Sequence, residues 1–203
     1  ALRAQINPHF LYNSLSLINW KAIEYGQDDI SGITLALSNY YRTSLNKGKN
    51  TLTVKQELSN MESYLNIQQI MHDNSFDVVM DIDENVLEYE SLNLILQPLV
   101  ENAISYGAEV SLDICTITVS VRENADAIVM EVIDDGVGMS EEELEAVRSY
   151  TFKPKGHGIG LKNISERLKM DDENSIFYID SVSGKGTNVT IKLHKRAKGD
   201  QDV

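Results

Sequence analysis

The spacing of apolar residues changes near residue 75, and this change limits the folds open to the chain. Before that point, Leu2, Ile6, Phe10 and Leu17 lie close to one stripe at helical spacing. After it, short alternating runs that are typical of strands are mixed with helical segments. We therefore predict an α+β chain, in which an all-α module precedes an α/β sandwich.

The residues before position 75 predict a helical hairpin and a third helix. A break at 25–29 separates the first helix from a second one over roughly 29–46. Two such helices have too little core to stand alone, so we expect a second copy of the chain to complete a four-helix bundle in a homodimer. Thr53 and Gln56 form a capping-box pattern for a third helix that runs to about Met71 and connects the hairpin to the rest of the chain.

The residues after position 75 predict alternating strands and helices. Pro98 must kink the apolar helix expected over 92–106 or begin a new segment there. Ser140 precedes three glutamates and so predicts a capped acidic first turn. The other expected elements are strands at 76–82, 115–121, 128–133, 175–182 and 187–193, and a helix near 159–170. We divide the chain into a helical dimerisation domain (1–52), a connecting helix (53–73), a catalytic domain (74–195) and a tail (196–203).

The composition excludes some classes of function. A formal net charge of −13 gives the chain no electrostatic attraction to phosphate backbones, so nucleic-acid binding is not expected. The single cysteine, Cys115, rules out an intrachain disulfide and has the pattern of a buried core residue. The sequence has no apolar run long enough to span a bilayer and no signal peptide. It starts at Ala1, without Met and already in a helical pattern, and we interpret it as a piece of a longer protein.

The stretch from Val132 to Met139 carries the clearest chemical signal. A buried strand ends in Asp134 and Asp135, and Gly136 and Gly138 follow at alternate positions. Because side chains alternate along a strand, Asp134 shares a face with core residues and needs a hydrogen-bond donor. The exocyclic amine of adenine is such a donor, and the glycines would let the backbone approach the base. Alone, the same residues also fit a simple Asp-Gly turn.

Two further stretches fit the remainder of a nucleotide. The run from Gly156 to Leu161, with Gly158 and Gly160, comes just before a helix and offers backbone N–H groups to a polyphosphate, although it lacks the Lys-Ser/Thr ending of a Walker loop. On the preceding helix, Gln97, Glu101 and Ser105 form a polar stripe with Asn102 beside it, and the Asn102 carbonyl oxygen suits Mg²⁺. Each signal alone is weak, and a solvated helix face is the plain alternative for the second.

Together these stretches resemble the four sequence boxes of the ATPase fold shared by gyrase, Hsp90, histidine kinases and MutL. They occur in the expected order: Leu96–Ala103, Asp134–Gly138, Gly156–Leu161 and Gly184–Thr187. The resemblance implies that Asn102 coordinates Mg²⁺ and that Asp134 holds the adenine amine of ATP. It also implies that Gly158 and Gly160 border the phosphates, that Tyr106 packs near the base, that Thr187 belongs to the nucleotide site, and that 139–157 form a flexible lid.

The first residues resemble the phosphoacceptor box of the YesM/LytS-like branch of histidine kinases, over Gln5–Leu15. The resemblance implies that the neutral imidazole of His9 attacks the γ-phosphoryl group of ATP. Asn13 lies one helical turn further on and is a hypothetical phosphatase residue. Phe10 stands where many histidine kinases have an acid, so either Glu101 orients the imidazole or no acid does. Pro98 and Ser105 replace other polar residues of the common pattern.

The resemblance implies a sensor histidine kinase that phosphorylates its own His9 and passes the phosphoryl group to an aspartate of a response-regulator receiver domain. It implies ATP and Mg²⁺ as cofactors, and the cytoplasmic portion of a bacterial plasma-membrane protein whose membrane contact lies in a missing sensor region. Two alternatives remain open at this stage. One is an ATPase of the same fold that uses ATP for conformational switching, and the other is an inactive relative that only binds nucleotide.

Overall fold

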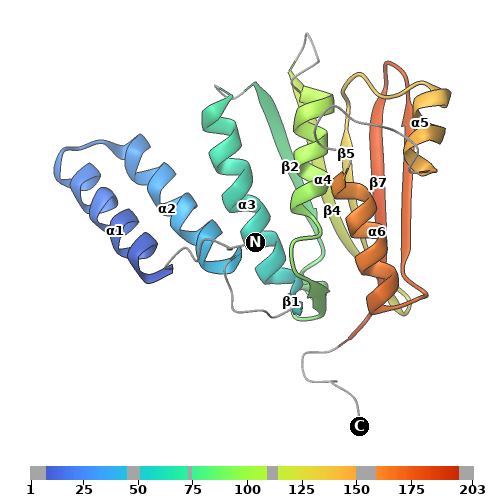
Figure 1. The fold of residues 1–203 in the computed structure, drawn as a ribbon, viewed down its shortest axis with the longest axis horizontal. Coiled ribbons are helices and arrows are strands. Elements are labelled where there is room, and N and C mark those ends of the chain that lie inside the picture. The colour runs from blue at the N-terminus through green and yellow to red at the C-terminus, as the bar shows by residue number, and fades with distance from the viewer. Residues whose placement is uncertain (1–7, 45–50, 73–74, 109–113, 150–158, 197–203) are drawn as a thin grey trace, which may run out of the picture.

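The structure is a computed structural model that describes residues 8–44, 51–72, 75–108, 114–149 and 159–196 (Figure 1). A helical hairpin lies on one side, and a mixed sheet covered by helices lies on the other. Within the described residues, no helix is both long and apolar enough to cross a bilayer. The predicted α+β architecture is confirmed, with the helical hairpin preceding a sandwich of helices and sheet.

The hairpin consists of α1 (Pro8–Glu24) and α2 (Asp28–Ser44), close to the predicted bounds. Gly26 makes the turn with a φ of 65°, in the left-handed region that glycine adopts readily. The Tyr12 hydroxyl donates to the Tyr41 carbonyl oxygen at 3.2 Å and ties the two helices together. Leu15 and Ala22 are buried between the helices, but most of the large apolar side chains of α1 are exposed.

The third helix, α3 (Val54–Met71), begins at the predicted capping box, in which the Thr53 hydroxyl accepts from the Gln56 N–H. Unlike a free connector, it packs into the main core through buried apolar residues on one face, Val54, Leu58, Met61 and Leu65. Just before it, β1 (Thr51–Thr53) pairs antiparallel with β3 (Glu90–Leu92), a pairing that the sequence pattern did not predict. The start of α3 is thereby fastened to the sheet-containing part of the chain.

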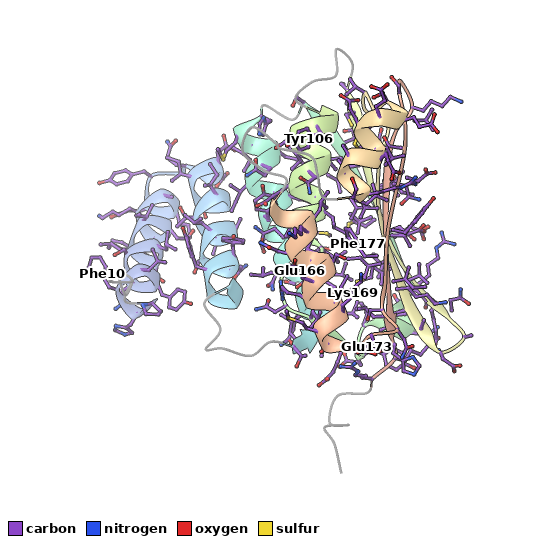
Figure 2. All side chains as sticks on the ribbon, turned by 45° about the vertical axis from the view of Figure 1, so that its right-hand side comes forward. Phe10, Tyr106, Glu166, Lys169, Glu173 and Phe177 are labelled. Atoms are coloured by element: carbon purple, nitrogen blue, oxygen red, sulfur yellow. The ribbon has the colours of Figure 1, made fainter. Side chains whose placement is uncertain are left out.

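The main sheet has five strands in the order β2-β4-β5-β7-β6. Their bounds are β2 Phe76–Ile82, β4 Cys115–Asn124, β5 Ala127–Asp134, β6 Ile176–Val182 and β7 Gly186–His194. Strand β2 runs parallel to β4, and the other neighbours are antiparallel. The helices α3, α4 and α6 cover one face, so the core lies between these helices and the sheet (Figures 1 and 2).

The helix predicted over 92–106 divides into three parts. Leu92 belongs to β3, α4 covers Gln97–Asn102, and a wider π-helical turn, η2, covers Ala103–Ala108. Pro98 lies in the first turn of α4, where its missing N–H would have no helical partner, so of the two predicted options it begins a new segment. The remaining elements are η1 (Glu84–Val86), α5 (Glu141–Arg148) and α6 (Ile159–Asp171).

Candidate nucleotide-binding site

Asp134 ends β5 with a buried carboxylate that is only 7% exposed. Burial raises the pKa of this carboxyl group to about 6, while hydrogen bonds from the backbone N–H groups of Gly136 and Thr187 act in the opposite direction. The Gly136 N–H donates to Oδ1 at 3.1 Å. A buried carboxylate with two N–H donors still has lone pairs for a further donor, such as an exocyclic amine.

Two glycines bring the backbone close to this carboxylate. A Cβ added at Gly107, in η2, would lie 2.9 Å from Asp134 Oδ1, and one added at Gly136 would lie 2.4 Å from Gly107 Cα. Any larger side chain at either position would fill the space around the carboxylate. Gly136 was predicted, but Gly107 was missed because a lone glycine inside an apolar helical pattern carries no signal of its own.

The turn between β6 and β7 packs onto the same strand end. Gly186 has a φ of 95°, and a Cβ there would lie 1.8 Å from the Asp134 carbonyl oxygen. Gly138 has a φ of 62°, and a Cβ there would lie 2.1 Å from the Val182 carbonyl oxygen. Both positions therefore require glycine for conformation and for space. The second and fourth sequence boxes, Asp134–Gly138 and Gly184–Thr187, thus pack against each other. Thr187 of β7 is the residue paired with Asp134 of β5.

Ser181 of β6 joins these loops and was not predicted. Its hydroxyl donates to the Gly186 carbonyl oxygen at 2.9 Å, accepts from the Met139 N–H at 2.9 Å and lies 3.0 Å from Thr187 Oγ1. The hydroxyl therefore links the loop after β5, the β6–β7 turn and the predicted site residue Thr187. Its sequence neighbourhood is an ordinary strand, so only the fold reveals this role.

The polar side chains of α4 are held by each other and by their own helix. The Asn102 side-chain amide nitrogen donates to the Pro98 carbonyl oxygen at 2.7 Å, which leaves the amide oxygen as the group able to bind a cation. The Gln97 amide donates to Glu101 Oε1 at 3.1 Å and to the Tyr40 hydroxyl of α2 at 3.0 Å. In the described residues, no group of three or more His, Cys, Asp or Glu side chains could hold a metal by itself.

These residues fit Mg²⁺ as part of a nucleotide complex. Mg²⁺ usually takes one or two protein oxygens and completes its shell with water and substrate phosphates. One oriented amide oxygen on α4 meets that requirement, whereas a cage made only of protein ligands is absent from the described part. Tyr106, in η2, is 43% exposed and precedes Gly107, which borders the Asp134 carboxylate (Figure 2).

The phosphate-binding box is described only at its end. Gly160 and Leu161 open α6, and a Cβ added at Gly160 would lie 3.7 Å from Pro98 Cβ, so the starts of α6 and α4 face each other. Gly156 and Gly158 lie outside the described residues. The described part of the predicted lid includes α5, whose Arg148 donates to the Ile179 carbonyl oxygen at 2.7 Å. That hydrogen bond holds α5 against β6.

The predicted phosphoacceptor, His9, is exposed on the first turn of α1. Asn13 lies on the same face, with its Nδ2 at 3.4 Å from His9 Nδ1. Phe10 is 72% exposed and points away from the rest of the molecule at the outer edge of the hairpin (Figure 2). The chain thus combines an accessible histidine on a helical hairpin with a glycine-lined carboxylate in an α/β sandwich.

Comparison with known families agrees with this combination. The family model described as "Histidine kinase" matches residues 1–76, and the one described as "Histidine kinase-, DNA gyrase B-, and HSP90-like ATPase" matches residues 88–197. The chain belongs to the histidine kinase family. The second match also confirms the predicted ATPase fold of the sandwich.

Several curated histidine kinases are similar over nearly the whole chain. Sensor histidine kinase YesM of Bacillus subtilis is 36% identical over 95% of this chain, and sensor protein LytS of Bacillus cereus is 31% identical over 100% of it. Sensor histidine kinase YpdA of Escherichia coli is 33% identical over 84%. The matched regions make up 32%, 35% and 30% of those proteins, so the chain spans about a third of their length.

Solved histidine kinases share the fold at low sequence identity. The catalytic domain of histidine kinase ThkA superposes with a TM-score of 0.56 at 18% identity, covering 71% of this chain and 94% of that one. The histidine kinase domain of the blue-light activated kinase EL346 from Erythrobacter litoralis gives a TM-score of 0.55 at 14% identity, covering 92% and 93%. The second comparison includes the helical hairpin as well as the sandwich.

In this histidine kinase chain, the helix that carries the predicted phosphoacceptor is separated from the candidate nucleotide site. Helices α2 and α3 lie between α1 and α4 (Figure 1). The hairpin instead contacts the sandwich through α2, where Tyr40 bonds to Gln97 and its ring lies 6.2 Å from that of Tyr64 on α3.

Proposed function

We propose that this chain binds ATP with Mg²⁺, phosphorylates itself on His9 and passes the phosphoryl group to an aspartate of a response-regulator receiver domain. The observation that carries the proposal is the buried carboxylate of Asp134, raised in pKa and enclosed by glycines, in a chain that also presents an accessible His9. The similarity to sensor histidine kinases over most of the chain supports the same reaction.

In this proposal, the adenine amine donates to Asp134, and Thr187 adds a hydroxyl at the same end of the site. Gly136 leaves room beside the carboxylate for the base, Gly138 lets the loop after β5 pack on the β6–β7 turn, and Tyr106 packs near the base. The phosphates extend toward the start of α6, where Gly156, Gly158, Gly160 and Leu161 are proposed to border them. The buried position of Asp134 makes its bond to adenine stronger than it would be in water.

Asn102 is the proposed protein ligand of Mg²⁺. Its amide nitrogen is engaged by the Pro98 carbonyl oxygen, so its amide oxygen is oriented without further ordering. When bound, Mg²⁺ would neutralise charge on the phosphates during transfer. The protein's own contribution is to hold the nucleotide in line with the imidazole and to exclude water from the closed site.

His9 is the proposed nucleophile: an imidazole nitrogen bonds to the γ-phosphorus, the bond from that phosphorus to the β–γ bridging oxygen breaks, and ADP leaves. Asn13 lies within reach of Nδ1 and is proposed to position the water that hydrolyses the phosphorylated partner in a phosphatase reaction. Glu101 is the proposed acid that orients the imidazole, because Phe10 provides no carboxylate on α1. Since α2 and α3 separate α1 from α4, transfer requires either a movement of the hairpin or a histidine from a second subunit (Figure 1).

The second subunit is proposed to pack on the hairpin, whose surface carries exposed apolar side chains. The large ones that are between 47% and 72% exposed include Phe10, Leu17, Ile18, Trp20, Ile23, Ile30 and Leu35. Burying part of this apolar surface in a four-helix bundle supplies the core that one hairpin lacks. In the same proposal, residues 1–52 form the dimerisation domain, and the whole protein is held at the membrane by a region outside this chain.

Labelling with γ-³²P-ATP and Mg²⁺ tests the reaction. The wild-type chain should acquire label that is labile in acid and stable in base, and His9→Gln should acquire none. Glu101→Gln should bind ATP normally but label much more slowly, because it removes the orienting acid and keeps the shape. Label that persists in His9→Gln would contradict the proposal. Bound ATP without label in the wild type would favour a nucleotide-binding relative instead.

A further inference from the structure

A second buried carboxylate lies away from the candidate nucleotide site. Glu57, on α3, is 1% exposed and accepts three backbone hydrogen bonds. The Leu94 N–H donates to Oε2 at 2.9 Å, and the N–H groups of Ile95 and Leu96 donate to Oε1 at 2.7 and 2.9 Å. A carboxylate that is removed from water in this way is stable only because these donors replace its hydration.

The three N–H groups belong to the residues that lead into α4. The first N–H groups of a helix have no partner within the helix, and Leu96, at the start of α4, supplies no side-chain cap. Glu57 accepts from the N–H of Leu96, the N-cap residue of α4, and from the N–H groups of the two residues before it, so a side chain on another helix fixes the segment that leads into α4. Leu94 has a φ of 56°, a conformation that is costly for a leucine and that its bond to Glu57 helps to hold.

Arg167, on α6, holds the same residues from the opposite side. Its guanidinium donates to the carbonyl oxygens of Asn93 and Leu94. Burial raises the pKa of Glu57, whereas the three backbone hydrogen bonds and the positive charge of Arg167 lower it. Residues 93–96 are thus held by an acceptor on α3 and a donor on α6, and we call Glu57, Arg167 and residues 93–96 the buried clamp.

We propose that the buried clamp sets the position of Asn102, which makes Glu57 and Arg167 positioning residues for the Mg²⁺–phosphate end of the nucleotide site. The path from Glu57 to Asn102 is short: a hydrogen bond at each end is joined by the peptide chain between Leu96 and Pro98. Glu57 holds Leu96, Pro98 follows two residues later, and the Pro98 carbonyl oxygen accepts the hydrogen bond that orients the Asn102 amide. Arg167 lies on α6, whose first turn contains Gly160, so it fixes the start of α4 relative to the predicted phosphate-binding box.

This inference rests on the proposed role of Asn102 and makes a selective prediction. The adenine end of the site is built by Asp134 at the end of β5, Gly136 in the loop after it and Thr187 on β7, with Gly107 of η2 beside the carboxylate. The hydrogen bonds to Asp134 come from the backbone N–H groups of Gly136 and Thr187 and do not involve the buried clamp. Loss of Glu57 should therefore weaken the part of ATP affinity that depends on Mg²⁺ and leave the Mg²⁺-independent part intact. A role in general stability alone would weaken both parts together.

The test is calorimetric titration of ATP into the full chain, once with Mg²⁺ and once with EDTA. Glu57→Gln keeps the size of the side chain but places an amide NH₂ against backbone donors. We expect the gain in affinity from Mg²⁺ to fall about ten- to a hundredfold, the usual cost of losing a residue that orients a metal ligand. Affinity in EDTA should stay within about twofold of wild type. Arg167→Met should show the same selectivity.

Met61→Ala is the matched control, because Met61 is fully buried on the same helix and its loss opens a cavity in the core. It should lower the thermal midpoint and keep the Mg²⁺ gain. The inference is overturned if Glu57→Gln keeps the full gain or if Met61→Ala loses it equally. Should Glu57→Gln fail to fold, Glu57→Asp takes its place; it keeps the charge on a shorter side chain and should lose part of the gain.

The same titrations separate this inference from the proposed kinase reaction. Wild-type chain that binds ATP with a Mg²⁺ gain but never labels His9 would contradict the kinase, while a selective loss in Glu57→Gln would still support the buried clamp. If the wild-type chain labels His9, the kinase proposal is supported. If, in addition, Mg²⁺ raises the ATP affinity of Glu57→Gln as much as that of the wild type, the proposed role of the buried clamp is overturned.

Discussion

Replacing Asp134 with asparagine should stabilise the nucleotide-free protein and weaken its binding of ATP. The carboxylate is buried, and that burial raises its pKa from an ordinary value of 3.8 to about 6. At neutral pH, burying the ionised Asp134 carboxylate therefore lowers the free energy of unfolding. Asparagine has nearly the same shape and no charge, so Asp134→Asn removes this cost but also removes the charged acceptor that we propose for the adenine amine.

The size of the effect follows from the pKa. A rise from 3.8 to about 6 corresponds to about 3 kcal/mol of lost stability at pH 8, where the carboxyl group is ionised in both the folded and the unfolded states. One of the two N–H donors to the carboxylate will be bonded less well by asparagine, which costs about 1 kcal/mol. The variant should therefore be more stable than wild type by about 2 kcal/mol at pH 8.

The sign of the pH dependence is fixed by the same values. Below pH 3.8 the group is protonated in both states, and the cost is absent; it grows as pH rises toward about 6 and is complete above that value. Urea unfolding of both proteins at pH 4.5 and pH 8 should show the advantage of Asp134→Asn shrinking at the lower pH. A variant that is less stable than wild type at pH 8, or an advantage that does not change with pH, would refute the reasoning.

Three further predictions concern the same regions. ATP affinity of the wild type should fall as pH drops below about 6, because protonated Asp134 accepts a hydrogen bond more weakly, and calorimetry in Asp134→Asn should show no such fall. Gly138→Ala should lower the free energy of unfolding by at least about 2 kcal/mol more than Gly184→Ala, since both have positive φ but only Gly138 has a carbonyl oxygen in the way; equal losses in urea titrations would contradict this. Tyr40→Phe and Gln97→Leu should show a coupling free energy of about 1 kcal/mol in a double-mutant cycle, and additive losses would mean that their hydrogen bond is not formed in solution.

Local signals in the sequence predicted the individual elements well. The capping box predicted at Thr53 and the capped acidic first turn predicted after Ser140 are both present, because each pattern and the hydrogen bonds that satisfy it lie within four residues. The alternation of Val189, Ile191 and Leu193 likewise identified the last strand, in which all three are buried. Asp134 was placed correctly on the core side of its strand by the same alternation.

Features that depend on distant residues escaped the sequence analysis. Nothing in the run Thr51–Thr53 indicates that it pairs with Glu90–Leu92, since a three-residue strand has too few positions for a period. Glu57 resembles any glutamate in the first turn of a helix, and only the fold brings residues 94–96 to it. The roles predicted for His9, Asn13, Glu101 and the glycines at 156 and 158 stay predictions, to be decided by labelling and titration.

The embedding of α3 in the core has a consequence for synthesis of the chain. The apolar face of α3 is made early, yet elements that pack against it, such as β3 and α4, are translated later. The α1–α2 hairpin is complete before α3, so it can fold while the rest of the chain is still on the ribosome. We therefore expect two nascent chains to be able to pair through their hairpins before either has a finished nucleotide domain, with α3 exposed as a target for chaperones in the interval.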